Sequence, residues 1–169
     1  LLANAASLVT RVQDLVSTGA NGFEFLKLDS GMTELLRPSL YGAQHPIVVV
    51  APPGHEAERE KAKPYVVVGH CCESGDLMTP APDEPETIAE RLTLEAAVDD
   101  VVVVEGVGAY CSSMATTNYN SFPQAPEVLL EKKGDASAAD AALHLIRRKQ
   151  SLDQILENEI PLSLSEADF

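Results

Sequence analysis

The sequence predicts a mainly β protein, built as an antiparallel barrel or a folded sheet. About seven or eight short apolar runs, rich in β-branched residues, are spaced along the 169 residues. Turn-forming segments rich in Gly, Pro, Asn and Asp separate these runs. One segment alone, residues 151–156, combines a helix cap with a helical apolar face. Many short strands with few helices are typical of barrels and folded sheets.

Alternation of apolar and polar residues predicts the first two strands. Residues 7–16 fit either a helix or a strand, and the turn-forming sequence that follows them favours the strand. Residues 23–29 alternate cleanly. This pattern predicts a half-buried strand whose apolar side is formed by Phe23, Phe25 and Leu28.

Proline and charged residues mark the segments expected to be irregular. Residues 32–36 predict at most a brief helical turn, because Pro38 disfavours the helical conformation at Arg37. Residues 52–63 are charged and flanked by proline, which predicts an exposed hairpin or loop. Residues 79–90 contain three prolines and have an acidic bias, so we expect a solvated, mobile loop.

β-branched and apolar runs predict the remaining strands, at residues 47–51, 65–69, 92–96, 101–104, 127–131 and 143–147. The small, polar residues 111–121 predict a helical turn followed by irregular chain. The predicted helix begins with Ser151 as its cap and ends at Pro161. Its apolar face is formed by Leu152, Ile155 and Leu156.

The length favours one domain, which we expect over residues 1–162 with residues 163–169 as a tail. The chain begins with Leu1 and not with Met, so we expect it to be a piece of a longer protein. Residues 1–12 then fit the junction to a preceding part.

Charge and hydropathy limit the classes of partner. The formal net charge of −14 argues against a nucleic-acid partner, because phosphate would be repelled over most of the surface. Small-molecule or protein partners fit better. No uninterrupted apolar run is long enough for a membrane helix, so we expect no membrane partner. No signal peptide is visible either, which favours a cytoplasmic protein, with an organelle left open because the N-terminus is missing.

The cysteines and histidines favour a reducing compartment and no metal site. Three cysteines is an odd number, and the adjacent Cys71 and Cys72 do not suit disulfide geometry. No pair of C-x-x-C motifs is present, and the four histidines are scattered. We therefore expect no structural zinc site.

Side chains that can take part in catalysis or ligand binding occur in three segments between or after apolar runs. Residues 72–76, Cys-Glu-Ser-Gly-Asp, follow the strand predicted at residues 65–69. Residues 106–110, Gly-Val-Gly-Ala-Tyr, follow the run at residues 101–104. Upstream, residues 29–41 contain an Asp-Ser-Gly-Met sequence and then Arg-Pro-Ser-Leu-Tyr. Because strand ends place side chains rigidly, these three junctions predict one functional site.

Each candidate also has a simpler structural interpretation. Cys72 is either a reactive thiol or inert packing. As a reactive thiol it could act as a nucleophile or as a proton donor, and its acidic neighbours favour the donor because they keep it protonated. Glu73 is either a ligand for a substrate cation or a solvated carboxylate. Arg37 and Tyr41 either bind a planar carboxylate, for which guanidinium is suited, or pack together on the surface. Asp76 is interpreted as structural, bonding backbone amides of its turn.

The glycines at residues 106 and 108 do not make a dinucleotide-binding loop, because the third glycine and the long helix are missing. Small residues before Tyr110 would still let a phosphate or another ligand approach the backbone closely. The structural alternative for Tyr110 is an ordinary half-buried aromatic residue.

Three stretches, DSGMTELLRPSLYGAQHPI, CESGD and GVGAYCSSMATTNYNS, closely resemble the diaminopimelate decarboxylases. These enzymes belong to the fold-type III, pyridoxal-phosphate-dependent amino-acid decarboxylases. The resemblance runs from about Leu2 to about Glu157 and maps onto the C-terminal part of the family. It implies the β domain of the alanine racemase and decarboxylase type, with the N-terminal (β/α)8 barrel absent from this chain.

The resemblance also implies roles for five residues. Cys72 matches the proton donor that reaches across a homodimer interface, and Glu73 matches the residue that holds the distal ammonium of the substrate. Arg37 and Tyr41 match the pair that binds the distal carboxylate. Tyr110 matches the tyrosine that contacts the cofactor phosphate and lies near the substrate.

Departures from the family pattern surround these residues. His70 stands where proline is common, Cys71 where an apolar residue is common, and Cys111 where glycine is often found. Asn118 and Tyr119 complete the family-like pattern and are interpreted as packing residues, together with Met114 and Asn120. No lysine matches the Schiff-base lysine of pyridoxal 5'-phosphate, which is expected outside this chain.

The resemblance implies that the intact enzyme decarboxylates meso-2,6-diaminopimelate to L-lysine and CO2 in lysine biosynthesis, and that this fragment is inactive alone. Another fold-type III decarboxylase, acting on carboxynorspermidine or a related substrate, is the first alternative. A non-catalytic regulatory homologue is the second. It is less favoured, because such a protein would normally have lost the site residues that remain here.

Overall fold

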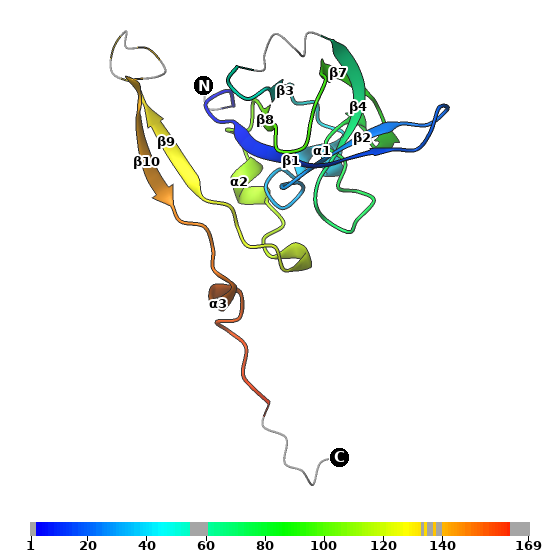
Figure 1. Ribbon diagram of the computed structural model, residues 1–169. Coiled ribbons are helices and arrows are strands. Elements are labelled where there is room, and N and C mark those ends of the chain that lie inside the picture. The colour runs from blue at the N-terminus through cyan, green and yellow to red at the C-terminus, as the bar shows by residue number, and fades with distance from the viewer. Residues whose placement is uncertain (1–2, 55–60, 133, 135–136, 138–139, 163–169) are drawn as a thin grey trace. The chain divides into compact units, whose positions relative to one another are not determined.

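The computed structural model describes residues 3–54, 61–132, 134, 137 and 140–162 (Figure 1). Contacts within the chain group it into two compact units, Leu1–Asn120 and Ser121–Phe169. The main sheet and every residue predicted to act in the site belong to the first unit. The predicted tail, residues 163–169, lies outside the described residues.

A six-stranded sheet forms the first unit, in the strand order β3-β8-β1-β2-β4-β7. Its strands are β1 (Leu8–Ser17), β2 (Glu24–Leu28), β3 (Ile47–Val50), β4 (Ala62–Val68), β7 (Arg91–Leu94) and β8 (Val101–Val104). The end strands β3 and β7 also contact each other, so the sheet nearly closes into a barrel. This architecture confirms the predicted mainly β fold class. One pair departs from the antiparallel expectation, because β2 and β4 run parallel.

The β-branched runs bury one face of each strand. Strand β8 lies between β1 and β3 in the sheet. Its Val102 and Val104 are fully buried, whereas Val101 is 36% exposed. Burial stabilises the fold by about 25 cal/mol for each Å² of apolar surface removed from water. The core cluster comprises Val12, Leu26, Leu28, Leu35, Val49, Tyr65, Val67, Met78, Ala96, Val102, Val104 and Cys111.

Strand β2 buries a different face from the one predicted. Leu26 and Leu28 are fully buried, whereas Phe23 is exposed and Phe25 is half-buried. Side chains alternate along a strand, so Phe23 and Phe25 share a face with Lys27 and not with Leu28. The two phenylalanine rings pack edge to face, with centroids 6.2 Å apart. The prediction was wrong because it placed Leu28 on the same face as Phe23 and Phe25, although odd- and even-numbered residues of a strand point to opposite faces.

Helix α1 (Arg37–Tyr41) begins where the sequence predicted a stop. Pro38 lies in the first turn, where a residue has no intrahelical N–H bond to lose, so the ring is tolerated even though Arg37 precedes it. Gly42 ends the helix in a left-handed conformation, and its N–H donates to the carbonyl of Pro38 at 2.9 Å. Arg37 is therefore helical, contrary to the prediction.

The segment predicted as a mobile loop forms a hairpin of β5 (Pro80–Ala81) and β6 (Glu84–Ile88). Thr79 fixes its base, because its buried hydroxyl accepts the N–H of Val67 at 3.0 Å. The carbonyl of Thr79 also accepts the N–H of Ala89 at 3.0 Å. The prolines and acidic residues predicted a loop, but hydrogen bonds to β4 hold this segment in an ordered conformation that the local sequence does not indicate.

Strand β4 starts earlier than predicted, whereas the helical turn after β8 lies where the sequence placed it. β4 starts at Ala62, inside the segment predicted as an exposed loop, of which residues 55–60 lie outside the described residues. α2 (Cys111–Met114) and the 3-10 turn η2 (Tyr119–Ser121) confirm a helical turn followed by irregular chain. Within the described ranges, no helix has the length and apolarity that crossing a membrane requires.

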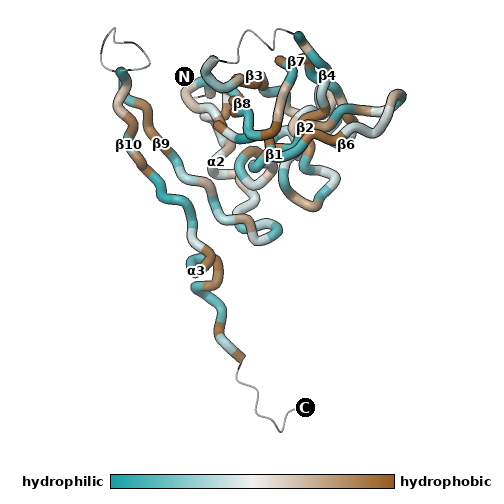
Figure 2. Tube along the Cα trace, in the orientation of Figure 1, coloured by the Kyte–Doolittle hydropathy of each residue, from teal (hydrophilic) through white to brown (hydrophobic). Residues whose placement is uncertain are grey.

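The second unit is an antiparallel hairpin of β9 (Glu127–Glu131) and β10 (Ala142–Arg147), followed by helix α3 (Leu152–Ile155). Figure 2 shows apolar residues along both strands of this hairpin. Ser151 caps α3 as predicted, since its hydroxyl accepts the N–H of Gln154 at 3.2 Å. The helix ends well before Pro161, because isolated helices gain little without burial and Leu152 and Leu156 stay exposed.

Candidate active site

Asp76 ties together two of the three loops that carry the candidate residues. It is 2% exposed, and its carboxylate accepts the N–H groups of Met32 at 2.7 Å and of Cys71 at 2.8 Å. Gly31 and Gly69 make room for it, since a Cβ at either position would lie 2.4 Å or 2.2 Å from a carboxylate oxygen. Asp76 thus bonds backbone amides as expected, but one of them belongs to a distant loop.

Met32 connects these two loops to the third. Its carbonyl accepts the hydroxyl of Thr116 at 3.1 Å, while its N–H is held by Asp76. The segments after β2, β4 and β8 therefore meet through hydrogen bonds at one residue. This network explains how three separate strand ends come to share one region of the molecule.

Arg37, Tyr41 and Tyr110 form one group of candidate residues. The Cζ atom of Arg37 lies 5.4 Å from the ring centroid of Tyr41 and 5.8 Å from that of Tyr110. Both are cation–π contacts by distance. Tyr41 is 50% exposed and Tyr110 is 69% exposed, so both phenols reach solvent. A half-buried guanidinium between two accessible phenols is suited to binding an anion such as a carboxylate or phosphate.

Tyr110 is held in an unusual backbone conformation. Its φ of 66° lies in the left-handed region, which costs a non-glycine residue about 1–2 kcal/mol. Cys111, which follows it, is buried in the core cluster, and burial raises the pKa of its thiol against the opposing charge of Arg37. The residue that follows exposed Tyr110 is thus anchored in the core.

Glu73 and Tyr119 form a second group. The hydroxyl of Tyr119 donates to Oε2 of Glu73 at 3.1 Å, and the N–H of Gly75 donates to Oε1 at 2.9 Å. These donors, Gly75 first and then Tyr119, lower the pKa of Glu73. Tyr119 was predicted to be a packing residue, and its contact with Glu73 spans 46 residues of sequence. The Asn-Tyr-Asn pattern was the only signal for it.

The two neighbouring cysteines differ in environment. Cys72 is exposed, whereas Cys71 is half-buried. Burial, followed by the charge of Asp76, raises the pKa of Cys71 to about 12. Cys71 therefore remains a thiol at neutral pH, while Cys72 is the thiol that a ligand can reach.

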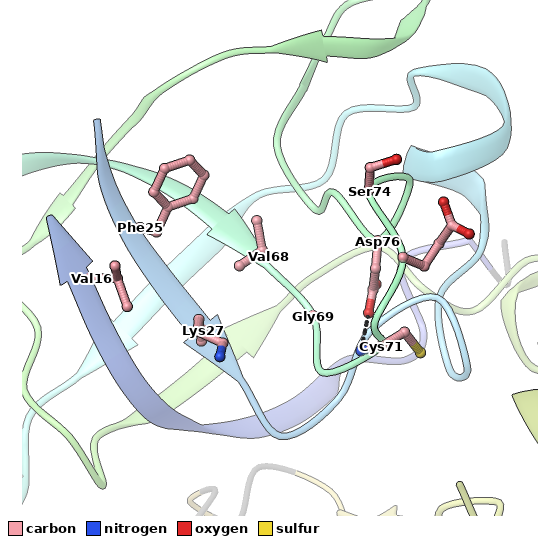
Figure 3. A pocket seen from close by; sticks show the side chains of 9 residues that line it. Val16, Phe25, Lys27, Val68, Gly69, Cys71, Ser74 and Asp76 are labelled. Atoms are coloured by element: carbon pink, nitrogen blue, oxygen red, sulfur yellow. Dashed lines mark hydrogen bonds between the residues drawn. The ribbon is translucent and has the colours of Figure 1, made fainter. Parts of the chain in front are cut away.

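An open groove of about 420 Å³ lies beside this loop. Figure 3 shows Phe25 and Lys27 of β2 on one side and Cys71, Ser74 and Asp76 on the other. The complete lining comprises Val16, Phe25, Lys27, Val68, Gly69, Cys71, Glu73, Ser74 and Asp76. The groove thus includes Glu73 from the second group and no residue of the Arg37 group.

His70 joins the first two loops at a second point. Its Nε2 lies 2.7 Å from the hydroxyl oxygen of Thr33, which donates to the carboxylate of Glu34 at 2.5 Å. The imidazole also lies 4.0 Å from that carboxylate, and both side chains are nearly buried. The histidine that departs from the family pattern therefore acts here as a buried polar link. Within the described residues, no cluster of three or more metal-binding side chains is found.

Comparison with known proteins identifies the class. Residues 2–108 match the family described as "Pyridoxal-dependent decarboxylase, C-terminal sheet domain", which covers more than half of the chain. The chain belongs to this family, and the part matched is its sheet domain.

The named relatives are more specific. Diaminopimelate decarboxylase of Escherichia coli strain K12 is 35% identical over 160 residues, which are 95% of this chain and 35% of that protein. A crystal structure of a diaminopimelate decarboxylase superposes with a TM-score of 0.80 at 32% identity, over 93% of this chain and 34% of that one. The Helicobacter pylori enzyme complexed with L-lysine gives 0.70 at 33% identity, over 94% and 32% of the chains. The chain thus spans about a third of the length of its relatives.

Proposed function

We propose that this chain is the C-terminal part of a diaminopimelate decarboxylase. The intact enzyme would release CO2 from meso-2,6-diaminopimelate and form L-lysine, in lysine biosynthesis. The observation that carries the proposal is the contact of Arg37 with the rings of Tyr41 and Tyr110. Diaminopimelate has a second carboxylate, at the end distant from the reacting carbon, and this group needs a cationic partner with further donors.

Different residues of this chain bind the different groups of the substrate. The guanidinium of Arg37 and the phenol of Tyr41 hold the distal carboxylate. Glu73, whose pKa is lowered by the hydrogen bonds from Gly75 and Tyr119, pairs with the distal ammonium, because either charge alone would be costly to remove from water. The exposed thiol of Cys72 supplies the proton that replaces CO2 on the reacting carbon.

Pyridoxal 5'-phosphate fits the first group of residues. The phenol of Tyr110 is exposed and Arg37 lies beside it, so a phosphate oxygen can accept a hydrogen bond next to a positive charge. When bound, the cofactor would withdraw electrons from the reacting carbon. Its Schiff-base lysine would belong to the part of the enzyme outside this chain, so the fragment would be inactive alone.

A homodimer accounts for the separation of the two groups. The cation–π contacts of Arg37 involve Tyr41 and Tyr110, whereas Glu73 bonds with Tyr119 and lines a groove that includes none of the Arg37 group. We infer that Cys72 and Glu73 of one subunit complete the site of its neighbour. Three free cysteines are typical of a reducing compartment, which supports a cytoplasmic enzyme.

Replacing Arg37 in the full-length enzyme tests the substrate. R37A is expected to lower kcat/KM for meso-2,6-diaminopimelate by about a hundredfold or more, through loss of a charge-assisted hydrogen-bonding pair. R11A is the matched control, because Arg11 is exposed and its ion pair is with exposed Asp99, with 3.6 Å between the guanidinium nitrogen and the carboxylate oxygen. It should leave the kinetics unchanged.

The outcome separates the candidate functions. Unchanged diaminopimelate kinetics in R37A, with turnover of carboxynorspermidine or a related substrate, would favour another fold-type III decarboxylase. A wild-type enzyme that decarboxylates none of these substrates but alters the rate of an active decarboxylase would indicate a regulatory homologue.

A further inference from the structure

Tyr119 contacts the residue that the proposed function assigns to the distal ammonium. Its hydroxyl donates to one oxygen of Glu73, and the N–H of Gly75 donates to the other. A carboxylate has about four lone-pair sites, so these two hydrogen bonds leave it able to accept from a further donor. The hydrogen bonds at both oxygens fix the rotation of the carboxylate, which a single bond would leave free.

The backbone presents Tyr119 in a constrained way. Its neighbours Asn118, Asn120 and Ser121 have φ values of 64°, 52° and 61°, all in the left-handed region. Asn tolerates this region better than most residues, which explains its presence on both sides of the tyrosine. The N–H of Tyr119 donates to the carbonyl of Thr116 at 3.1 Å. The ring is therefore positioned by its own segment as well as by Glu73.

The same segment is fastened to the loops of the site. Thr116 donates its hydroxyl to the carbonyl of Met32, whose N–H is held by Asp76. Asp76 also holds Cys71, the residue two positions before Glu73. Tyr119 and Glu73 are thus connected by three hydrogen bonds and short stretches of backbone, and the bond between their side chains closes this path into a ring.

We propose that Tyr119 is a positioning residue that holds the carboxylate of Glu73 in the orientation that receives the distal ammonium of the substrate. This inference rests on the proposed function. Tyr119 does not touch the reacting carbon in this scheme, so it acts on substrate affinity through Glu73 and leaves the chemical step to other groups.

The variant Y119F of the full-length enzyme tests the inference, because it removes the hydroxyl and keeps the ring. The KM for meso-2,6-diaminopimelate and the dissociation constant of L-lysine, measured by calorimetry, are expected to rise about three- to tenfold. L-lysine is a suitable probe because it keeps the amine and carboxylate of the distal end. The kcat should change by less than about twofold.

The pH profile gives a second readout. The hydroxyl of Tyr119 lowers the pKa of Glu73, so its removal lets this pKa rise. Glu73 must be ionised to bind an ammonium, and the acid limb of kcat/KM should therefore move to higher pH in Y119F. The matched control is Y65F, since the buried hydroxyl of Tyr65 accepts the N–H of Ala96 at 3.2 Å. Y65F should lower thermal stability and leave KM unchanged.

A double-mutant cycle with E73Q distinguishes positioning from a general effect on the fold. In the E73Q background, Y119F should weaken L-lysine binding no further. An equal loss in both backgrounds, or wild-type KM and affinity in Y119F, would overturn the inference while the proposed function stands. A wild-type enzyme without diaminopimelate turnover would instead overturn the proposed function, and the inference with it.

Discussion

The carboxylate of Asp76 and the N–H of Met32 meet at 2.7 Å although 44 residues separate them in the sequence. The same carboxylate accepts the N–H of Cys71 with its other oxygen. One buried side chain therefore sets the distance between the loop that leads into Arg37 and the loop that carries Cys72. The geometry of the candidate site depends on this structural residue, which itself contacts no substrate in the proposed scheme.

Replacing Asp76 by Asn should destabilise the protein by about 3 kcal/mol, measured by urea denaturation. Asn has one acceptor oxygen for two N–H donors, and its amide would face the second donor. D83N is the control, because Asp83 is exposed and its left-handed φ of 61° suits Asn. Equal stabilities of the two variants would contradict the role assigned to Asp76.

Replacing Gly69 by Ala should destabilise the enzyme by about 2–4 kcal/mol. The new Cβ would lie 2.2 Å from a carboxylate oxygen of Asp76, and the buried carboxylate has nowhere to move. At Gly75 the same change places a Cβ 3.2 Å from the exposed Glu73, which can shift. Thermal melting of both variants is the measurement, and G75A should melt close to the wild type.

Replacing His70 by Ala should cost about 1–3 kcal/mol, because the hydroxyl of Thr33 loses a partner in a nearly buried setting. H144A is the control, since His144 is half exposed where it pairs with Glu131. Chemical denaturation of both variants compares the two losses. A larger loss in H144A would argue against a stabilising role for His70.

The two cysteines should differ in alkylation by iodoacetamide at pH 8. The thiolate is the reactive form, and a pKa of about 12 leaves about one in ten thousand Cys71 side chains ionised at that pH. Exposed Cys72 should react, and under the proposed function L-lysine should slow the reaction in the full-length enzyme. Labelling of Cys71 would rise only as the pH approaches its pKa.

Mass spectrometry of two serine variants checks this prediction. C71S should be labelled at Cys72 as fast as the wild type, and C72S should stay almost unlabelled at this loop. Rapid modification of Cys71 in C72S would show that its thiol is neither shielded nor held protonated.

Local patterns accounted for much of the fold. The strands over Leu8–Ser17, Val101–Val104 and Glu127–Glu131 follow apolar, β-branched runs, which suit a half-buried pleated surface wherever it occurs. The failures had both long-range and local causes. The hairpin at Glu84–Ile88 depends on Thr79 bonding to β4. The start of α1 was missed for a local reason, because Pro38 is tolerated in the first turn of a helix.

The sequence by itself determined which chemical groups are available: a guanidinium near a phenol, a thiol beside a carboxylate, and a second phenol after small residues. Side-chain chemistry is a property of each residue, so these candidates were recognisable before the structure. Only the tertiary structure decided that Arg37, which contacts Tyr41 within one helix, also lies against Tyr110, and that Tyr119 bonds with Glu73. Such pairings depend on long-range hydrogen bonds and on strand register, which no local stretch of sequence encodes.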